Sequence, residues 1–304
     1  KGQKMSVQVT FNASKNRYEG FVNGKKVSHS VHKDYVENKV QMLAGRQANV
    51  QKALQDKRDE FGINKRFDFV KQMVGMVASK TVASAIITGQ GGLGKSHTVL
   101  KALESEGLQN VTDLADFEVG SVMRASKCYR IVKGFSTAKG LYRTLFEANK
   151  MTLVFDDCDS VLKDPVALNV LKGALDSYSD RYISWNADMK DDDLPRTFKF
   201  EGSIVFISNM ELDRVDQAIR SRAMCVDLSM TQDQKIERMA VIAADKDFLP
   251  EYSDEVKADA LAFIGTMKDQ VENLSLRSLI AVSKIRATAK DWKDLAKYVL
   301  TQGA

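Results

Sequence analysis

Eight consecutive residues in the first third of the chain have the types and spacing of a phosphate-binding loop. They are Gly89, Gln90, Gly91, Gly92, Leu93, Gly94, Lys95 and Ser96, and His97 follows them directly. Glycines let backbone N–H groups turn inward around phosphate oxygens, and a helix beginning at the loop adds the positive end of its dipole. In this pattern the lysine contacts the β- and γ-phosphates and the serine hydroxyl ligates Mg²⁺. The loop therefore predicts binding of ATP with Mg²⁺, with His97 as an additional contact.

Two carboxylates follow an apolar run farther along the chain. The run Leu153-Val154-Phe155 ends in Asp156 and Asp157. Ligands of α/β sheets gather at the carboxyl ends of the strands, so these side chains are expected beside the phosphates. We expect Asp156 to hold Mg²⁺ through water and Asp157 to polarise the attacking water. A pair of exposed aspartates in a turn is the structural alternative.

The surrounding sequence supplies the sheet that these motifs need. From Val82 onward, apolar runs alternate with helical patterns, which predicts a mostly parallel sheet covered by helices. A helical pattern over His97–Glu106 follows the phosphate loop directly. The five strand-like runs are Val82–Thr88, Tyr129–Val132, Thr152–Phe155, Ile204–Ser208 and Met224–Leu228. Residues 61–230 are therefore predicted to form an α/β nucleotide-binding domain.

Different patterns flank this predicted domain. Residues 1–60 contain three short strands, with Asn23-Gly24 as a hairpin turn, and then a helical pattern that runs from Val36 to Leu54. Residues 231–304 show helical patterns throughout, and Thr231 is suited to be the first N-cap. The chain is thus predicted to contain a small β-β-β-α module, the α/β domain and a helical domain.

The charge of the chain is unevenly distributed. Its net charge is +5, and residues 1–60 hold 12 Lys and Arg against 6 Asp and Glu. The other residues hold 33 basic against 34 acidic side chains, so the whole basic excess lies in the first fifth of the sequence. Such a segment suits a polyanion such as DNA, and a solvated basic appendage is an equally weighted alternative.

Composition predicts a cytoplasmic protein. No run approaches the roughly 18 apolar residues that cross a bilayer, and the N-terminus is polar and basic, so neither a membrane span nor a signal segment is expected. The widely spaced cysteines Cys128, Cys158 and Cys225 are expected to be reduced thiols. The three histidines are too scattered for a metal site.

Together with three later motifs, the phosphate loop and the two carboxylates resemble the AAA+ ATPases over roughly residues 64–290. The later motifs are Ile204-Val205-Phe206-Ile207-Ser208-Asn209, Asp216-Gln217-Ala218-Ile219-Arg220-Ser221-Arg222 and Leu274-Ser275-Leu276-Arg277-Ser278-Leu279. The second is most similar to the Ser-Arg version found in clamp loaders. The resemblance implies that the helices after Thr231 form the AAA+ lid over the nucleotide.

The resemblance also implies roles for single residues. Asn209 would be the sensor 1 residue that helps to place the attacking water. Arg222, with Arg220 in reserve, would be the arginine finger that a neighbouring subunit contributes. Arg277 would be the sensor 2 residue that touches nucleotide from the lid. Each also has a structural alternative, as a turn residue or a solvated charge at the end of a helix.

Two departures from the family pattern affect the expected activity. The family usually has Glu where this chain has Asp157, so hydrolysis is expected to be slow or to need a rearrangement. Protein unfoldases of the family carry an aromatic pore loop after the second strand, and Phe135 is the aromatic that this chain offers there. A role in the core is the favoured alternative for Phe135, which weakens a protein-threading function.

An additional segment lies between Asp157 and Asn209. Arg181–Trp185 and Thr197–Phe200 alternate like the strands of a hairpin, and the acidic loop Met189–Leu194 joins them. Some AAA+ relatives carry a hairpin here that touches DNA. Because the acidic tip would repel phosphate, a structural or subunit-contact role is favoured.

The N-terminal module, through Tyr18–Ser28, faintly resembles the Apetala-type and integrase arm-type DNA-binding modules. In such modules a small sheet enters a groove and basic side chains meet phosphate. A small capping or oligomerisation domain is the alternative. The combined prediction is a DNA-associated AAA+ ATPase that forms a hexameric ring or a spiral, with DNA at the module or in the ring pore. A protein-remodelling ATPase and a nucleotide-switched scaffold with slow hydrolysis are the alternatives.

Overall fold

The computed structural model describes residues 6–45, 60–112, 125–134, 136–176, 180–186 and 194–302. Contacts within the chain divide it into two compact units, Lys1–Phe61 and Gly62–Ala304. The predicted division at residue 230, between an α/β domain and a helical domain, falls inside the second unit and stays a prediction. Phe135 and residues 189–193 of the acidic loop lie outside the described residues.

The first unit contains a three-stranded antiparallel sheet. Strands β1 (Val7–Asn12), β2 (Arg17–Val22) and β3 (Lys25–Ser30) pair in the order β1-β2-β3. Asn23 and Gly24 connect β2 to β3 with φ of 51° and 76°, the positive values that a two-residue hairpin of this type needs. The predicted meander and its Asn-Gly turn are confirmed.

A helix over residues 33–45 covers one face of this sheet. Val36 and Val40 are buried there against Val22. The helix lies close because Gly20 has no side chain, and a Cβ at that position would come within 2.3 Å of Val40 Cγ2. The helical pattern predicted for residues 46–54 lies outside the described residues.

The second unit contains a six-stranded parallel sheet with the order β11-β4-β10-β7-β6-β5. Its strands are β4 (Ser84–Thr88), β5 (Gln109–Asn110), β6 (Cys128–Lys133), β7 (Thr152–Asp156), β10 (Ser203–Ile207) and β11 (Met224–Asp227). All five predicted strands are present, and the two-residue edge strand β5 was not predicted. Because the strands are parallel, their carboxyl ends meet at one edge.

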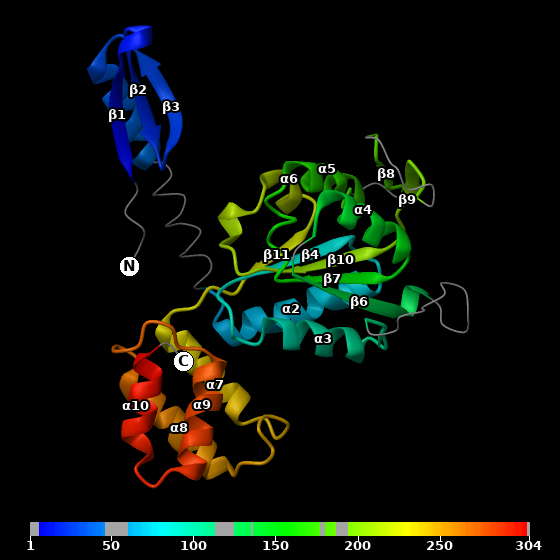
Figure 1. Ribbon diagram of the computed structural model, residues 1–304, viewed down its shortest axis with the longest axis vertical. Helices are drawn as coiled ribbons and strands as arrows, with labels where there is room; N and C mark the ends of the chain where they lie inside the picture. Colours follow the sequence, from blue (N-terminus) through cyan, green and yellow to red (C-terminus); the bar gives the residue numbers. More distant parts are fainter. Residues whose placement is uncertain are drawn as a thin grey trace. The chain divides into compact units, whose positions relative to one another are not determined.

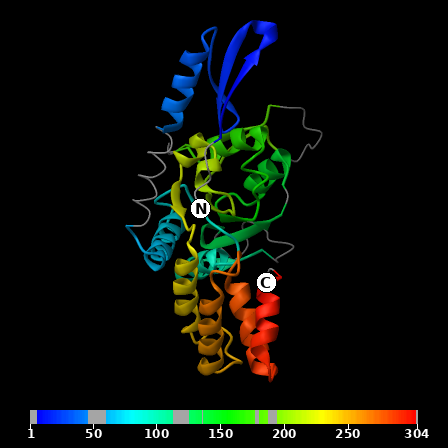
Figure 2. The ribbon, with the colours of Figure 1, turned by 90° about the vertical axis from the view of Figure 1, so that its left-hand side faces the viewer.

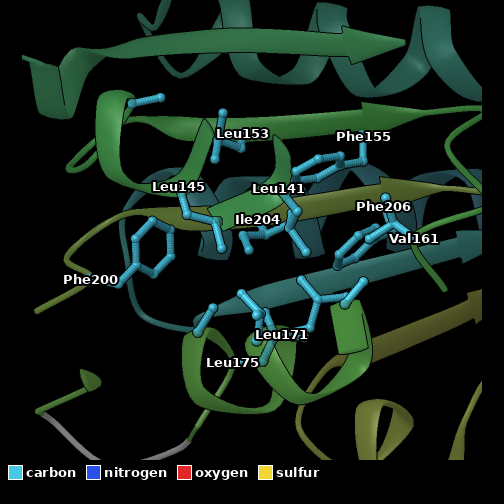
Figure 3. Close-up of a cluster of buried hydrophobic side chains, with 14 of the residues drawn as sticks. Leu141, Leu145, Leu153, Phe155, Val161, Leu171, Leu175, Phe200, Ile204 and Phe206 are labelled. Carbon is cyan, nitrogen blue, oxygen red and sulfur yellow. The ribbon is translucent and has the colours of Figure 1, made fainter. Parts of the chain in front are cut away.

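Side chains of the central strands alternate between two hydrophobic clusters, one on each face of the sheet. Leu153 and Phe155 of β7 join the first cluster with Ile204 and Phe206 of β10, as Figure 3 shows. Val154, between the two β7 residues, joins the second cluster. Burial on both faces is the reason that these strands appear as continuous apolar runs in the sequence.

Helices cover both faces of the sheet (Figure 1). The helices are α2 (Ile63–Ala78) and α3 (Lys95–Ser105) on one face, and α4 (Ala138–Glu147) and α5 (Pro165–Ala174) on the other. A short helix, α6 (Gln217–Arg220), precedes β11. Helix α5 was not predicted, although its start carries clear signals. Asp164 caps it by accepting from the Val166 N–H at 2.9 Å, and proline occupies its first position.

The predicted hairpin between β7 and β10 is confirmed. Strands β8 (Tyr182–Ser184) and β9 (Thr197–Lys199) are antiparallel, with Ile183 opposite Phe198. The ring of Phe198 packs edge-on against Tyr142 of α4, with centroids 5.2 Å apart. The hairpin therefore rests on α4 through aromatic contacts.

Four helices end the chain. They are α7 (Gln232–Ala243), α8 (Asp254–Met267), α9 (Leu276–Thr288) and α10 (Trp292–Thr301). Figure 2 shows them beside one another, and they enclose a hydrophobic cluster of their own. Thr231 caps α7 and Ser275 caps α9, each in a capping box. In the described part of the chain, no helix has the length and apolar character that crossing a membrane requires.

Candidate functional site

The predicted phosphate loop connects β4 to α3 at the carboxyl edge of the sheet. Gly92 and Gly94 have φ of 74° and 88°, in the left-handed region that glycine favours. Helix α3 begins at Lys95, so the loop wraps the helix N-terminus, where backbone N–H groups have no partners within the helix. This arrangement suits the binding of an anion such as phosphate.

Lys95 is buried at the centre of the loop. Its Nζ donates to Gly89 O at 2.6 Å, to Gln90 O at 2.7 Å and to Asn209 Oδ1 at 2.9 Å. Burial lowers the pKa of Lys95 to about 8, although the nearby carboxylate of Asp157 opposes this shift. The ammonium group is therefore still protonated at neutral pH, and it is held by neutral oxygens that phosphate oxygens can replace.

Ser96 and Asp156 meet beside the loop. Ser96 Oγ donates to Asp156 Oδ1 at 2.9 Å, and the Asp156 side chain is only 8% exposed. Mg²⁺ prefers oxygen ligands and commonly takes one or two from the protein and others from substrate phosphates, so this pair fits Mg²⁺. Among the described residues, no three His, Cys, Asp or Glu side chains form a metal-binding group. The fit to Mg²⁺ thus depends on phosphate and water as further ligands.

Asp157 and Asn209 face each other at the ends of β7 and β10. Asn209 Nδ2 donates to Asp157 Oδ1 at 2.6 Å, while Asn209 Oδ1 accepts from Lys95. Asp157 is exposed, and its φ of 56° lies in the left-handed region, which is uncommon for residues other than glycine. Its N–H donates to Ile207 O at 3.1 Å, which fixes this turn. The two carboxylates, the amide and the lysine therefore lie around one loop.

Two further residues at these strand ends form a bond that the sequence did not predict. Ser208 Oγ donates to Asp159 Oδ1 at 2.6 Å and accepts from the Met210 N–H at 3.0 Å. These bonds tie the turn after β7 to the turn after β10, which carries Asn209. The only sequence signal was that polar residues follow both strands.

The start of α9 lies directly against the phosphate loop. The Leu276 N–H donates to Gly92 O at 2.8 Å, and a Cβ on Gly92 would lie 3.1 Å from Ser275 Cβ. Arg277 follows in the first turn of α9, and its side chain is exposed. The helix thus brings Arg277 beside the loop, and the contact between Arg277 and nucleotide stays a prediction.

A cavity of about 810 Å³ lies next to the loop, between α3, α7 and α9. Its lining includes Gly94, His97, Ile242, Leu276 and Ile280. Charged side chains, among them Lys101, Arg238 and Asp245, also line it. His97 is exposed there, so the structure places this predicted contact beside the phosphate loop.

Arg222 and Arg220 lie at the other end of the sheet. Both precede β11, whose first residue, Met224, pairs with Ala85 near the start of β4, whereas the phosphate loop follows the end of β4. Arg222 Nη1 donates to Ala218 O at 2.9 Å, and its Nε is buried without a bond to the described residues. The structure therefore does not bring Arg222 to the phosphate loop of the same copy.

No protein-family model matches the chain. A relative by sequence is an uncharacterized 36.7 kDa protein from the nrdC-mobD intergenic region of Enterobacteria phage T4. It is 29% identical over 254 residues, which span 77% of this chain and 73% of that protein.

Similar solved structures include a point mutant of Thermotoga maritima RuvB, with 14% identity, a TM-score of 0.47, and coverage of 80% of this chain and 72% of that chain. The FIGL-1 AAA domain has 11% identity, a TM-score of 0.34, and coverage of 72% and 62%. The Escherichia coli MS115-1 complex of HORMA, CdnC and Trip13 has 10% identity, a TM-score of 0.39, and coverage of 81% and 92%.

The chain's own architecture agrees with the resemblance that its motifs carry. A helix-covered parallel sheet holds the phosphate loop between β4 and α3, and C-terminal helices meet that loop through Leu276. The second unit therefore has the helix-covered parallel sheet, with a phosphate loop at its carboxyl edge and helices after it, that the resemblance to the AAA+ ATPases implies.

Proposed function

We propose that the protein is an AAA+ ATPase that binds ATP with Mg²⁺ at the phosphate loop and hydrolyses it. The observation that carries this proposal is the convergence of five side chains from the ends of β4, β7 and β10. They are Lys95, Ser96, Asp156, Asp157 and Asn209, joined by hydrogen bonds of 2.6–2.9 Å. Phosphoryl transfer needs this combination of a cation, metal ligands and an acceptor for the proton of water.

Each of these side chains has a distinct role in the proposed reaction. Lys95 neutralises the β- and γ-phosphates, and Ser96 and Asp156 hold Mg²⁺, which neutralises phosphate charge when it is bound. Asp157 orients the attacking water and accepts its proton. Asn209 holds Asp157 through its Nδ2, so the carboxylate stays aimed at the site despite the short side chain.

Replacing Asp157 with Asn is expected to stop turnover and to leave ATP binding intact. The amide cannot accept the proton of water, and general-base catalysis is typically worth about 10²–10⁴ in rate. Phosphate release should fall by that factor, whereas the affinity for a fluorescent ATP analogue should not change. Asp159→Asn is the matched control, because Asp159 is bound to Ser208 and not to Asn209. Normal turnover in Asp157→Asn with loss in Asp159→Asn would transfer the role of base to Asp159.

The nucleotide is proposed to lie at a junction between copies of the chain, in a hexameric ring or a spiral. The position of Arg222 supports this, because it lies at the end of the sheet away from its own loop, on the side that the loop of a neighbouring copy would have to approach. An arginine supplied in trans stabilises the charge on the transferring phosphoryl group. Loss of the γ-phosphate would then loosen the junction, which couples hydrolysis to movement.

The protein is further proposed to act in DNA transactions, with the first unit as the DNA-binding part. This rests on the basic excess of residues 1–60 and on the face of the β1-β2-β3 sheet that the helix does not cover. Thr10, Glu19 and His29 pair across that face, on the opposite side from Gly20. Lys15 and Lys25 are exposed at the two ends of the sheet, and Lys25 is the register partner of Val22, whose side chain faces the helix.

Two of the basic side chains on this face are already paired. Arg17 Nη2 lies 3.1 Å from Glu19 Oε1, and Lys26 Nζ contacts the same oxygen. These contacts, that of Lys26 above all, lower the pKa of Glu19 to about 2. Arg17 and Lys26 are therefore expected to remain bound to Glu19, while Lys15 and Lys25 contact phosphate.

DNA binding is expected to weaken steeply with salt and to show little sequence preference. Each lost phosphate contact should reduce the slope of log affinity against log salt by about 0.9 for duplex DNA. We expect the double change of Lys15 and Lys25 to Glu, or the deletion of residues 1–60, to remove most of the affinity. Fluorescence anisotropy at two salt concentrations measures both effects.

Lys25→Glu and Lys39→Glu are a matched pair for the same assay. Both change the charge of the unit equally, but Lys39 lies on the helix, where it contacts Tyr35. A change of Lys26 is unsuitable, because Lys26→Glu would place a second carboxylate against Glu19. Equal affinity in the full chain and the truncated chain would move DNA binding to the ring pore and make the first unit a protein-contact module.

The ATPase rate with and without DNA separates the alternative functions. Stimulation by DNA would support the proposal, and stimulation by a protein client alone would favour a protein-remodelling ATPase. ATP binding with negligible turnover would favour a nucleotide-switched scaffold, for which the short side chain of Asp157 is the motivating observation.

A further inference from the structure

A second lysine contacts the carboxylate proposed to hold Mg²⁺. Lys133 is the last residue of β6, and it is the register partner of Asp156 in the parallel pair of β6 and β7. Its Nζ lies 3.6 Å from Asp156 Oδ2, while Ser96 Oγ binds Oδ1. The carboxylate is thus held on one oxygen by a hydroxyl and on the other by a positive charge.

The two partners of this ion pair differ strongly in burial. The Asp156 side chain is 8% exposed, whereas that of Lys133 is 67% exposed. A charged group that is buried is stabilised by a partner of opposite charge. A lysine on a flexible, solvated stem can provide that charge and can also leave without becoming a buried, unpaired cation.

The positive charge of Lys133 would also compete with that of a bound metal ion. A divalent cation held by Ser96 and Asp156 would lie near the ammonium group, and the two cations would repel each other. Both cations would compete for the charge of one carboxylate. The lysine that organises Asp156 in the absence of metal must therefore give way when the metal binds.

We propose that Lys133 is a positioning residue: before Mg²⁺ binds, it supplies the positive charge beside Asp156 that the metal supplies afterwards. It holds Asp156 beside Ser96, and it is displaced from the carboxylate when Mg²⁺ binds. The proposal rests on the proposed nucleotide site. It adds that Asp156 is held in place by Lys133 when the metal is absent and is released by Lys133 when the metal binds. Its consequence is that Lys133 favours metal-free nucleotide and disfavours the metal.

The expected effects of Lys133→Met have opposite signs. Without metal, the charge of Asp156 is compensated less and repels the phosphates more, so the affinity for nucleotide should fall. With nucleotide bound, the metal no longer displaces an ammonium group, so the affinity for metal should rise. Each change is expected to be roughly two- to fivefold, as for exposed ion pairs. A purely structural lysine would change both affinities in the same direction.

The experiment uses the full chain and a non-hydrolysable ATP analogue with a fluorescent label. Affinity for the analogue is measured in excess EDTA, and affinity for Mn²⁺, as a probe for Mg²⁺, is then measured by electron paramagnetic resonance with the unlabelled analogue at saturation. Lys133→Arg should behave as the wild type, because it retains the charge. Lys163→Met, on the exposed turn after β7, is the matched control and should change neither affinity.

Opposite changes in Lys133→Met, with normal behaviour of both other variants, would support the proposal. Unchanged affinities, or changes in the same direction, would overturn it while leaving the nucleotide site intact. If the wild-type chain binds no analogue with or without Mn²⁺, the result contradicts the proposed nucleotide site itself, and the proposed role of Lys133 is then wrong as well. Thermal unfolding of each variant, expected to match the wild type, shows that the chain is folded.

Discussion

Replacing Arg222 with Ala is expected to lower the rate of ATP hydrolysis by about 10³–10⁵, the range found for arginine fingers, while nucleotide affinity changes little. The finger neutralises charge that develops in the transition state, so its loss affects turnover more than ground-state binding. Phosphate release and equilibrium binding of a labelled analogue measure the two effects. Arg220→Ala is the control, because Arg220 lies in the same helix end. A loss confined to Arg220→Ala would reverse the assignment.

The contribution of Arg222 in trans has its own test. Arg222→Ala copies keep an intact phosphate loop, and Lys95→Ala copies keep an intact finger. In a mixed assembly, some junctions pair an intact loop with an intact finger, so mixing two inactive variants should restore part of the activity. A mixture as inactive as its components would contradict a site shared between copies. Mixing each variant with itself at the same total concentration controls for effects of concentration on assembly.

The phosphate loop and its setting were predictable because their signals are local. Glycine spacing, Lys95 and Ser96 occupy eight adjacent residues, and the apolar strand before them and the helix after them are also continuous in sequence. The same holds for the Asn23-Gly24 turn, whose backbone conformation depends on the two residues themselves. Local signals of this kind do not require knowledge of the strand order.

Contacts across the sheet were not predictable in the same way. The pairing of Lys133 with Asp156 depends on β6 lying beside β7, and that of Asp159 with Ser208 depends on β10 lying on the other side of β7. The pattern of apolar residues within one strand does not predict which strands lie beside it in the sheet. The sequence therefore predicted which side chains stand at strand ends, but not which of them share a bond.

In the first unit, the number of basic residues was not enough to predict which of them can contact DNA. The basic excess treats every lysine as available, whereas Arg17 and Lys26 both contact Glu19 on the same face of the sheet. Their pairing follows from the β2-β3 register and its irregularity at Gly20 and Phe21, which the sequence pattern did not reveal. Among the described residues of the sheet, the DNA-contact hypothesis therefore rests on Lys15 and Lys25.

Replacing Lys95 with Ala or Met is expected to remove ATP binding. In the proposed site Lys95 donates charged hydrogen bonds to two phosphates, and such bonds contribute about 1.5–3 kcal/mol each, so affinity should fall by at least about a hundredfold. Lys95→Met keeps the apolar stem and is the sharper variant, because it removes the charge with little loss of packing. Equilibrium binding of a labelled analogue measures the effect, and Lys172→Met on α5 is the control.

Folding stability separates this functional role from a structural one. Burial lowers the pKa of Lys95 to about 8, below its value in an unfolded chain, so the fold holds this charge at a cost at neutral pH. Removal of the charge should then leave the melting temperature unchanged or raise it, even though Gly89 and Gln90 lose a donor. A buried charge that lowers stability while it is present, and whose removal abolishes binding, is retained for binding its ligand and not for the fold. A large fall in melting temperature would instead assign Lys95 to the fold and reopen the question of what binds at the loop.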